Sequence, residues 1–276
     1  MRTQRFGLWT EFLFLFAFML RQTGRVVAVL AFGLILQSFN SDSSVSTPFM
    51  YELEVRMDGE DFETIADQLY NKFTFDEEST LDTDVFKRGL KGYVFLDQTN
   101  ELKNERYLTI IDYSLSSKKR RMWILDMQSK EVVMNELVAH GKNSGDEFAT
   151  VFSNRIQSKQ SSLGFYVTGE TYNGKHKYSL KLTGHESGFN TNAFARGLVI
   201  HGAHYVDDRL LTAGQRIGRS FGCPAVSQGV NKSLVDLVKG GSCLFVHSDN
   251  SRYLQQSKVL NNSLYIPLSQ LKKLLE

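Results

Sequence analysis

Residues 218–224 read Gly218-Arg219-Ser220-Phe221-Gly222-Cys223-Pro224, and this stretch says more about the chain than any other. It sets a thiol behind two glycines and a serine, where the backbone can turn sharply. Upstream, the apolar run 198–200 leads into His201 and Gly202. A thiolate is a nucleophile, and a nearby imidazole can hold a thiol in that form. The pattern therefore predicts an acyl-transfer centre, against the plainer alternative of a small buried cysteine.

Acyl transfer needs a nucleophile, a base and hydrogen-bond donors for the oxyanion. Cys223 supplies the sulfur, and His201 stands at the end of a predicted strand, where a rigid sheet can aim it. The backbone N–H groups of Gly222 and Cys223 are candidate oxyanion donors. A neighbouring imidazolium lowers a thiol pKa from about 8.5 to about 3.5–7.5. We therefore expect the pair to carry a thiolate at neutral pH.

Several ordered motifs share the chain with this turn. His201-Gly202-Ala203 is followed about twenty residues later by Ser220-x-Gly222-Cys223. Further matching segments are 138–145, 152–154, 161–166, 196–206 and 218–225. Together, from about Tyr93 to Val246, they resemble the L,D-transpeptidase catalytic domain family, the YkuD-type fold, and in particular its murein L,D-transpeptidase branch. The resemblance implies a mainly β (α+β) fold, a β-sandwich with a short N-terminal helical segment and peripheral helices.

The resemblance also implies roles. Cys223 would form a thioester, His201 would be the base, and the Gly202 carbonyl would orient the imidazole. Gly222 and Cys223 amides would form the oxyanion hole. The substrate would be a peptidoglycan stem tetrapeptide, cleaved between an L-centre and a D-residue. The acyl group would then pass to an amine of another stem, which gives a 3–3 cross-link.

Two positions depart from the commonest family pattern. Phe221 stands where most members carry a histidine, and Ala225 stands where they carry Arg or Asn. An Arg there would bind a substrate carboxylate bidentately. We expect Arg219 to take this role, with Arg216 and Arg196 as alternatives. The predicted substrate-binding residues are Arg219, Ser220, Phe221, His140, His204 and Tyr205.

Three other functions compete with the transpeptidase prediction. The same centre would act as an L,D-carboxypeptidase or cross-link hydrolase if water replaced the amine acceptor. The departures at Phe221 and Ala225 would also suit a non-catalytic wall-binding module. His201-x-x-His204 suggests zinc, but residues three apart on a strand face opposite sides, and no third ligand has suitable spacing. We therefore expect no metal and no cofactor.

Hydrophobic periodicity predicts a sheet-rich core with helices appended. Helices are expected over 61–75, 84–90, 230–238 and 269–275. Strands are expected over 107–113, 121–126, 132–138, 164–168, 178–182, 198–201 and 243–247. The predicted organisation is a leader and linker (1–45), a helical segment (46–100), a catalytic domain (101–250) and a C-terminal extension packed on the core (251–276).

Composition limits the partners and the compartment. A net charge of +2 without a basic block argues against nucleic acid, and we expect a monomer. The two cysteines, Cys223 and Cys243, are expected to be reduced, because a disulfide would disable the thiol chemistry. Apolar segments 12–20 and 26–36 surround Arg21 and Arg25 and predict export to the periplasm or cell envelope. The alternatives are an uncleaved inner-membrane anchor, a signal that starts at Met19, or a buried hairpin.

Overall fold

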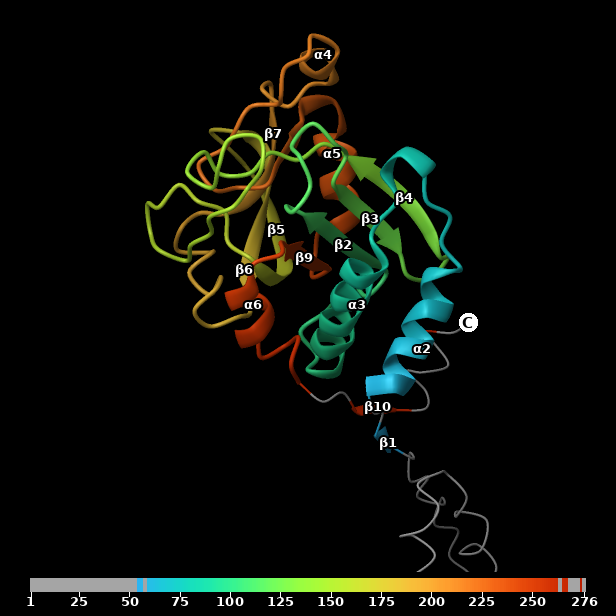
Figure 1. The fold of residues 1–276 in the computed structure, drawn as a ribbon. Helices are drawn as coiled ribbons and strands as arrows, with labels where there is room; N and C mark the ends of the chain where they lie inside the picture. The colour runs from blue at the N-terminus through green and yellow to red at the C-terminus, as the bar shows by residue number, and fades with distance from the viewer. Residues whose placement is uncertain (1–53, 57–58, 263–264, 268–273, 275–276) are drawn as a thin grey trace, which may run out of the picture. The chain divides into compact units, whose positions relative to one another are not determined.

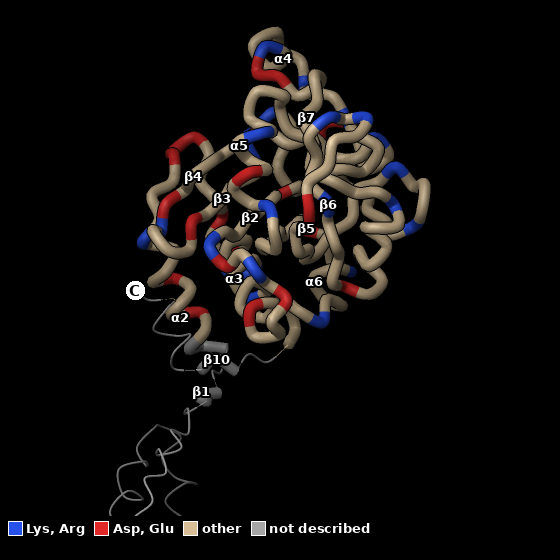
Figure 2. The backbone as a smooth tube through the Cα atoms, turned by 180° about the vertical axis from the view of Figure 1, so that it is seen from behind, with Lys and Arg blue, Asp and Glu red and all other residues tan. Residues whose placement is uncertain are grey.

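The computed structural model of the protein describes residues 54–56, 59–262, 265–267 and 274. The predicted leader and the polar linker that follows it, residues 1–45, lie outside these residues. None of the helices in the described part is long and apolar enough to cross a membrane. Figure 2 shows Lys and Arg interspersed with Asp and Glu along the backbone.

One eight-stranded mixed sheet forms the centre of the fold, in the order β4-β3-β2-β9-β5-β6-β7-β8 (Figure 1). β2 pairs with β9, and β7 with β8, in parallel, and the other neighbours are antiparallel. The strands are β2 (Tyr107–Asp112), β3 (Met122–Asp126), β4 (Glu131–Glu136), β5 (Gly164–Gly174), β6 (Lys177–Gly184), β7 (Val199–Ala203), β8 (Ala225–Ser227) and β9 (Cys243–His247). A separate two-stranded sheet pairs β1 (Glu54–Arg56) with β10 (Tyr265–Pro267).

The two edges of the large sheet meet. Just after β4, Ala139 bridges Ala225 of β8, and Gly141 bridges Ser220. The Ala139 N–H donates to the Ala225 carbonyl at 2.8 Å. One curled sheet therefore builds both layers of the predicted sandwich as a near-barrel, and the predicted mainly β class with peripheral helices is confirmed.

Helix α3 (Thr83–Gln98) packs against β2 and β9. Its N-cap Asp82 accepts hydrogen bonds from two backbone N–H groups of the first turn. A Cβ at Gly92 would lie 2.0 Å from the Phe165 ring, so only glycine permits this close approach. The remaining helices are α2 (Gly59–Tyr70), η1 (Glu77–Ser79), α4 (Asp208–Thr212), α5 (Gln228–Val238) and α6 (Ser251–Gln256).

The structure confirms all seven predicted strands and the helices predicted near 61–75 and 230–238. It extends the predicted helix 84–90 into α3, and it adds β8, α4 and α6. The helix predicted over 269–275 lies outside the described residues except for Leu274. Glu186 joins α6 to the core, because its carboxylate accepts hydrogen bonds from the Tyr253 and Ser257 hydroxyls and from the Phe165 N–H.

Candidate active site

The turn that carries Cys223 is held on both sides. On one side, β8 pairs in parallel with β7, which places His201 opposite Ala225. On the other side, the Lys142 N–H donates to the Ser220 carbonyl at 2.8 Å, and the Ser220 N–H donates to the His140 carbonyl at 2.9 Å. The closure of the near-barrel therefore fixes the backbone just before and just after the thiol.

Ser220 also stabilises the turn from inside. Its hydroxyl accepts from the Gly222 N–H at 3.0 Å and donates to the Cys223 carbonyl at 2.6 Å. Gly222 has a φ of +125°, a conformation that favours glycine, and a Cβ there would lie 2.8 Å from the Gln160 carbonyl oxygen. Because Ser220 is buried and its hydroxyl is occupied, it shapes the turn and does not face a substrate as predicted.

The predicted oxyanion donors differ in availability. The Gly222 N–H is bound to the Ser220 hydroxyl, so the role predicted for it would require that bond to break. Within the described chain, the Cys223 N–H donates no hydrogen bond to another residue. Of the two N–H groups, that of Cys223 is therefore not bound to a neighbouring residue, and it interacts with the Cys223 sulfur itself.

The Cys223 thiol is half-buried, and its sulfur lies 3.7 Å from the Gly197 carbonyl oxygen, to which it donates. Burial raises the pKa of this thiol, although the Val199 backbone and the Arg196 guanidinium act in the opposite direction. No hydrogen bond joins Cys223 to His201 among the described residues. Desolvation is the largest of these effects, so the direction of the pKa shift does not support the predicted preformed thiolate.

His201 is buried on β7, and its Nδ1 lies 3.1 Å from the Gly202 carbonyl oxygen. A carbonyl can only accept, so Nδ1 carries the proton and Nε2 keeps its lone pair. Burial lowers the pKa of His201; the Gly202 hydrogen bond opposes this shift and the nearby His176 adds to it. A raised thiol pKa and a lowered imidazole pKa together favour a neutral Cys223 beside a neutral His201.

A second imidazole lies at this site, and no sequence pattern predicted it. His176 comes from the tight turn between β5 and β6, and its ring stacks on that of His201, with centroids 4.2 Å apart and planes 26° apart. His176 is exposed. In the sequence it is one polar residue of a Gly174-Lys175-His176-Lys177 turn, and only the pairing of β6 with β7 brings it to the site.

His140 does not line the cleft as predicted, because it is completely buried. Its Nδ1 lies 2.8 Å from the guanidinium of Arg121, which also donates to the carbonyls of Leu115 and Val138. A guanidinium can only donate, so Nδ1 of His140 accepts and its proton sits on Nε2. Burial and the Arg121 charge lower the pKa of His140 to about 4. Burial lowers the pKa of Arg121 to about 10.

The other predicted residues lie around the turn in different ways. Tyr205 is half-buried, and burial together with the nearby Cys223 raises its pKa to about 12. His204 is exposed and its ring lies against that of Tyr205, with centroids 5.5 Å apart. Phe221 is 64% exposed, whereas Ala225 is buried in a small apolar cluster. This cluster lies at the seam, the place where the segment 139–141 after β4 pairs with Ser220 and Ala225. A long side chain at position 225 would therefore have no room.

The described residues contain no group of three His, Cys, Asp or Glu side chains that could hold a metal ion. His201 is buried on β7 and His204 is exposed in the following turn, so the two imidazoles of the zinc hypothesis lie in different surroundings.

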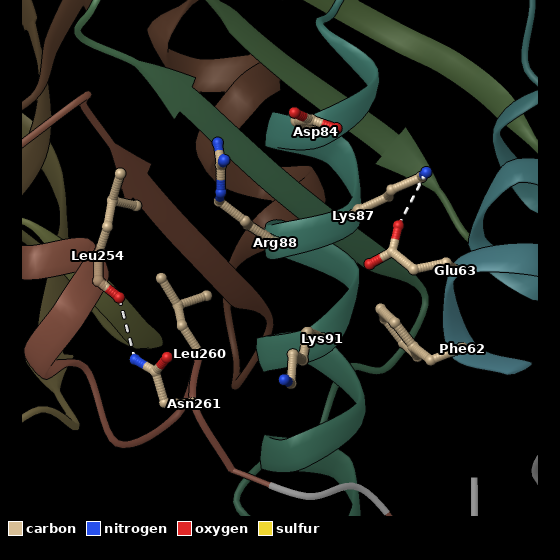
Figure 3. A pocket seen from close by; sticks show the side chains of 9 residues that line it. All are labelled: Phe62, Glu63, Asp84, Lys87, Arg88, Lys91, Leu254, Leu260 and Asn261. Carbon is tan, nitrogen blue, oxygen red and sulfur yellow. Dashed lines mark hydrogen bonds and ion pairs between the residues drawn. The ribbon is translucent and has the colours of Figure 1, made fainter. Parts of the chain in front are cut away.

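A pocket of about 410 Å³ lies elsewhere, between α2, α3 and the segment that includes α6 (Figure 3). Lys87 lines it and forms ion pairs with Glu63 at 2.9 Å and Asp67 at 2.8 Å. Arg88 and Lys91 follow on the same helix, with Leu254 and Asn261 opposite them. The residues that line this pocket include no thiol and no imidazole, so the Cys223 turn remains the candidate active site.

The family assignment comes from a comparison of the sequence with protein-family models. The model described as the L,D-transpeptidase catalytic domain matches residues 77–247, which include both His201 and Cys223. The chain belongs to this family. No curated protein matches the sequence.

Solved L,D-transpeptidases give weaker likenesses. The structures from Mycobacterium smegmatis and Mycobacterium tuberculosis are 12% and 13% identical, each over 51% of this chain, with TM-scores of 0.33 and 0.29. This chain spans 58% and 61% of their lengths. An L,D-transpeptidase from Xylanimonas cellulosilytica is 13% identical over 67% of this chain and 92% of its own, with a TM-score of 0.30. Because these scores are low, membership rests on the family match.

Proposed function

We propose that this chain is an envelope enzyme that acts on peptidoglycan stem peptides by acyl transfer through Cys223, and that it forms 3–3 cross-links. One observation supports the chemistry most directly. The hydrogen bond from His201 Nδ1 to the Gly202 carbonyl leaves Nε2 unprotonated, on the strand that pairs with the strand after Cys223. An imidazole in this tautomer can accept a proton from a thiol.

The first half of the reaction makes the thioester. The sulfur turns from the Gly197 carbonyl toward His201 and attacks the carbonyl carbon between the L-centre and the D-residue of the stem. The thiol proton passes to Nε2 of His201, and the oxyanion meets the Cys223 N–H. The C–N bond then breaks, and the leaving amine of the D-residue takes the proton from Nε2.

The second half decides between the two enzymatic functions. An amine of another stem attacks the thioester, His201 accepts its proton, and the returning thiolate is reprotonated. The product is then a 3–3 cross-link. If water attacks instead, the same steps give a free tripeptide, and the chain is an L,D-carboxypeptidase. We favour transfer because the family is that of transpeptidases.

Incubation with a tetrapeptide stem, followed by mass spectrometry, tests this proposal. A 3–3 dimer supports transfer, and a tripeptide with a free terminal D-residue supports hydrolysis. Cys223→Ala should abolish both products while the circular-dichroism spectrum stays the same. Cys243→Ala is the matched control and should keep turnover, because Cys243 is completely buried in β9.

Alkylation gives an independent readout. Iodoacetamide above pH 9 should label Cys223 and spare Cys243 in the folded protein, because Cys223 is half-buried whereas Cys243 is completely buried in β9. Absence of both turnover and a Cys223 adduct would contradict the enzyme proposal and favour the wall-binding module.

A further inference from the structure

An exposed aromatic ring sits directly before the Gly222-Cys223 pair, and two lysines lie against it. Phe221 is 64% exposed. The Lys142 ammonium lies 4.8 Å from the centroid of its ring, and the Lys159 ammonium lies 5.5 Å from it. Each contact is within the range of a cation–π interaction. Two cations therefore share one ring beside the nucleophile, at the position where most family members carry a histidine.

Backbone hydrogen bonds connect both lysines to the Cys223 turn. The Lys142 N–H donates to the Ser220 carbonyl at 2.8 Å, and the Asn143 N–H donates to the Lys159 carbonyl at 3.1 Å. Both side chains are exposed. The backbone of Lys142 is thus bonded directly to the Cys223 turn, and that of Lys159 is connected to it through Asn143.

The arginines predicted to bind a substrate carboxylate are already occupied. Arg196 donates to the carbonyls of Ser153 and Gln160 and to the hydroxyls of Ser158 and Ser162. Arg216 and Arg219 both pair with Asp146, at 2.6 and 3.2 Å, and Arg219 also donates to the Gly145 carbonyl. Each of these three guanidinium groups therefore already has acceptors within the protein.

Lys142 and Lys159 differ from these arginines. Within residues 59–262, neither ammonium has a carboxylate within ion-pair distance, and each lies over the Phe221 ring. Two like charges near one ring repel each other, and an anion bound between them would relieve that repulsion. These two lysines are thus the cations beside the Cys223 turn that are free to bind an anionic ligand.

We propose that Phe221, Lys142 and Lys159 form a subsite that selects stems carrying a free carboxylate over stems in which that carboxylate is a carboxamide. The subsite rests on the proposed function and adds the substrate class. The ring holds the two ammonium groups at its face, and their remaining N–H groups bind the carboxylate oxygens. The charge of the substrate is then recognised at Phe221, where this chain departs from the family pattern.

The test compares two tetrapeptide stems that differ only in whether one side carboxylate is free or amidated. The full chain should process the free-acid stem with a kcat/KM about tenfold higher, which two partly exposed ion pairs can supply. Lys142→Gln/Lys159→Gln should remove this preference, chiefly through a higher KM for the free-acid stem. Lys103→Gln/Lys258→Gln carries the same net charge, changes two exposed lysines away from the turn, and should keep the preference.

Binding to the inactive protein supplies a second readout. In a Cys223→Ala background, calorimetry should give a Kd for the free-acid stem about tenfold higher when both lysines of the subsite are Gln. Equal processing of both stems by the unaltered chain would overturn the subsite and leave the proposed function standing. Loss of the preference in both double variants would overturn it too, because net charge would then be the cause. Absence of turnover of every stem would instead contradict the proposed function.

Discussion

Two buried histidines flank the turn that carries Cys223, and they are held in opposite tautomers. Nδ1 of His201 faces the Gly202 carbonyl, which can only accept a hydrogen bond. Nδ1 of His140 faces the Arg121 guanidinium, which can only donate. His201 therefore offers the lone pair of Nε2, whereas in His140 the proton occupies Nε2. The partner of Nδ1, more than burial, decides which ring can act as a base.

Replacing the two histidines in turn should give the largest difference in kcat. His201→Gln removes the base, and we expect kcat to fall about 10²–10⁴-fold, the usual contribution of a general base. His140→Asn keeps an acceptor for Arg121, and kcat should stay within a few-fold of the original. Steady-state kinetics with a tetrapeptide stem measures both variants. Equal losses of kcat in the two variants would remove the distinction between the rings.

Arg121 should matter for folding more than for chemistry. It is completely buried and donates to two carbonyls and to His140, so Arg121→Met leaves these acceptors without partners. Breaking such a buried charged network destabilises a protein by roughly 3–5 kcal/mol. Denaturant unfolding measures the change in free energy.

The neighbouring Arg120 is the control for that experiment. It forms partly exposed ion pairs with Glu136 and Asp208, so Arg120→Met should lower the free energy of unfolding by less than about 1 kcal/mol. A loss in Arg121→Met no larger than in Arg120→Met would show that the buried network does not stabilise the seam.

The His140 tautomer also predicts a pH dependence of stability. Its pKa is about 4 in the folded protein and near 6.5 when unfolded, so the unfolded chain binds a proton first as the pH falls. The stability that the neutral ring contributes is complete above pH 6.5 and is lost between pH 6.5 and 4. At about 1.36 kcal/mol for each pKa unit, this loss is about 3 kcal/mol.

His140→Asn isolates that contribution, because all other titrating groups remain in both proteins. The free energy of unfolding should be measured at pH 7 and at pH 4. Its fall between these two pH values should be about 3 kcal/mol smaller in the variant than in the unaltered chain. Parallel pH profiles would mean that folding does not lower the pKa of His140, and that Arg121 does not hold its tautomer.

Most of the strands and the main residues of the candidate site could be predicted from the sequence. Alternating and continuous apolar runs predicted seven strands, and the Ser220-x-Gly222-Cys223 and His201-Gly202 motifs pointed to the thiol and the imidazole of the candidate site. β8 was missed because it has three residues and follows Pro224, so it reads as part of the turn. α3 was predicted too short because Gly92 interrupts its pattern, although that glycine marks the contact with the sheet.

The electrostatic properties of the site could not be predicted from the sequence. A histidine does not reveal whether its Nδ1 will meet a carbonyl or a guanidinium, because the partner comes from the closure of the sheet. His140 and Arg121 come together from different segments, and so do His176 and His201. Exposed lysines such as Lys142 give no signal either, until the fold brings them to an aromatic ring beside the nucleophile.

His176 should produce the smallest effect. It stacks on His201 in the folded protein, whereas the ring that lies edge-on to His140 is Tyr113, which cannot become a cation. His176→Ala exposes the His201 ring to water and removes the imidazole that lowers its pKa. Both changes raise the pKa of His201, so the acid limb of the kcat/KM profile should move to higher pH.

The stacking of His176 on His201 is itself worth about 0.5 kcal/mol, so the rate at the pH optimum should change roughly twofold. His176→Phe keeps an aromatic ring over His201 without the imidazole and should shift the limb less than Ala does. A limb that stays fixed in both variants would mean that the stacked ring does not tune the base.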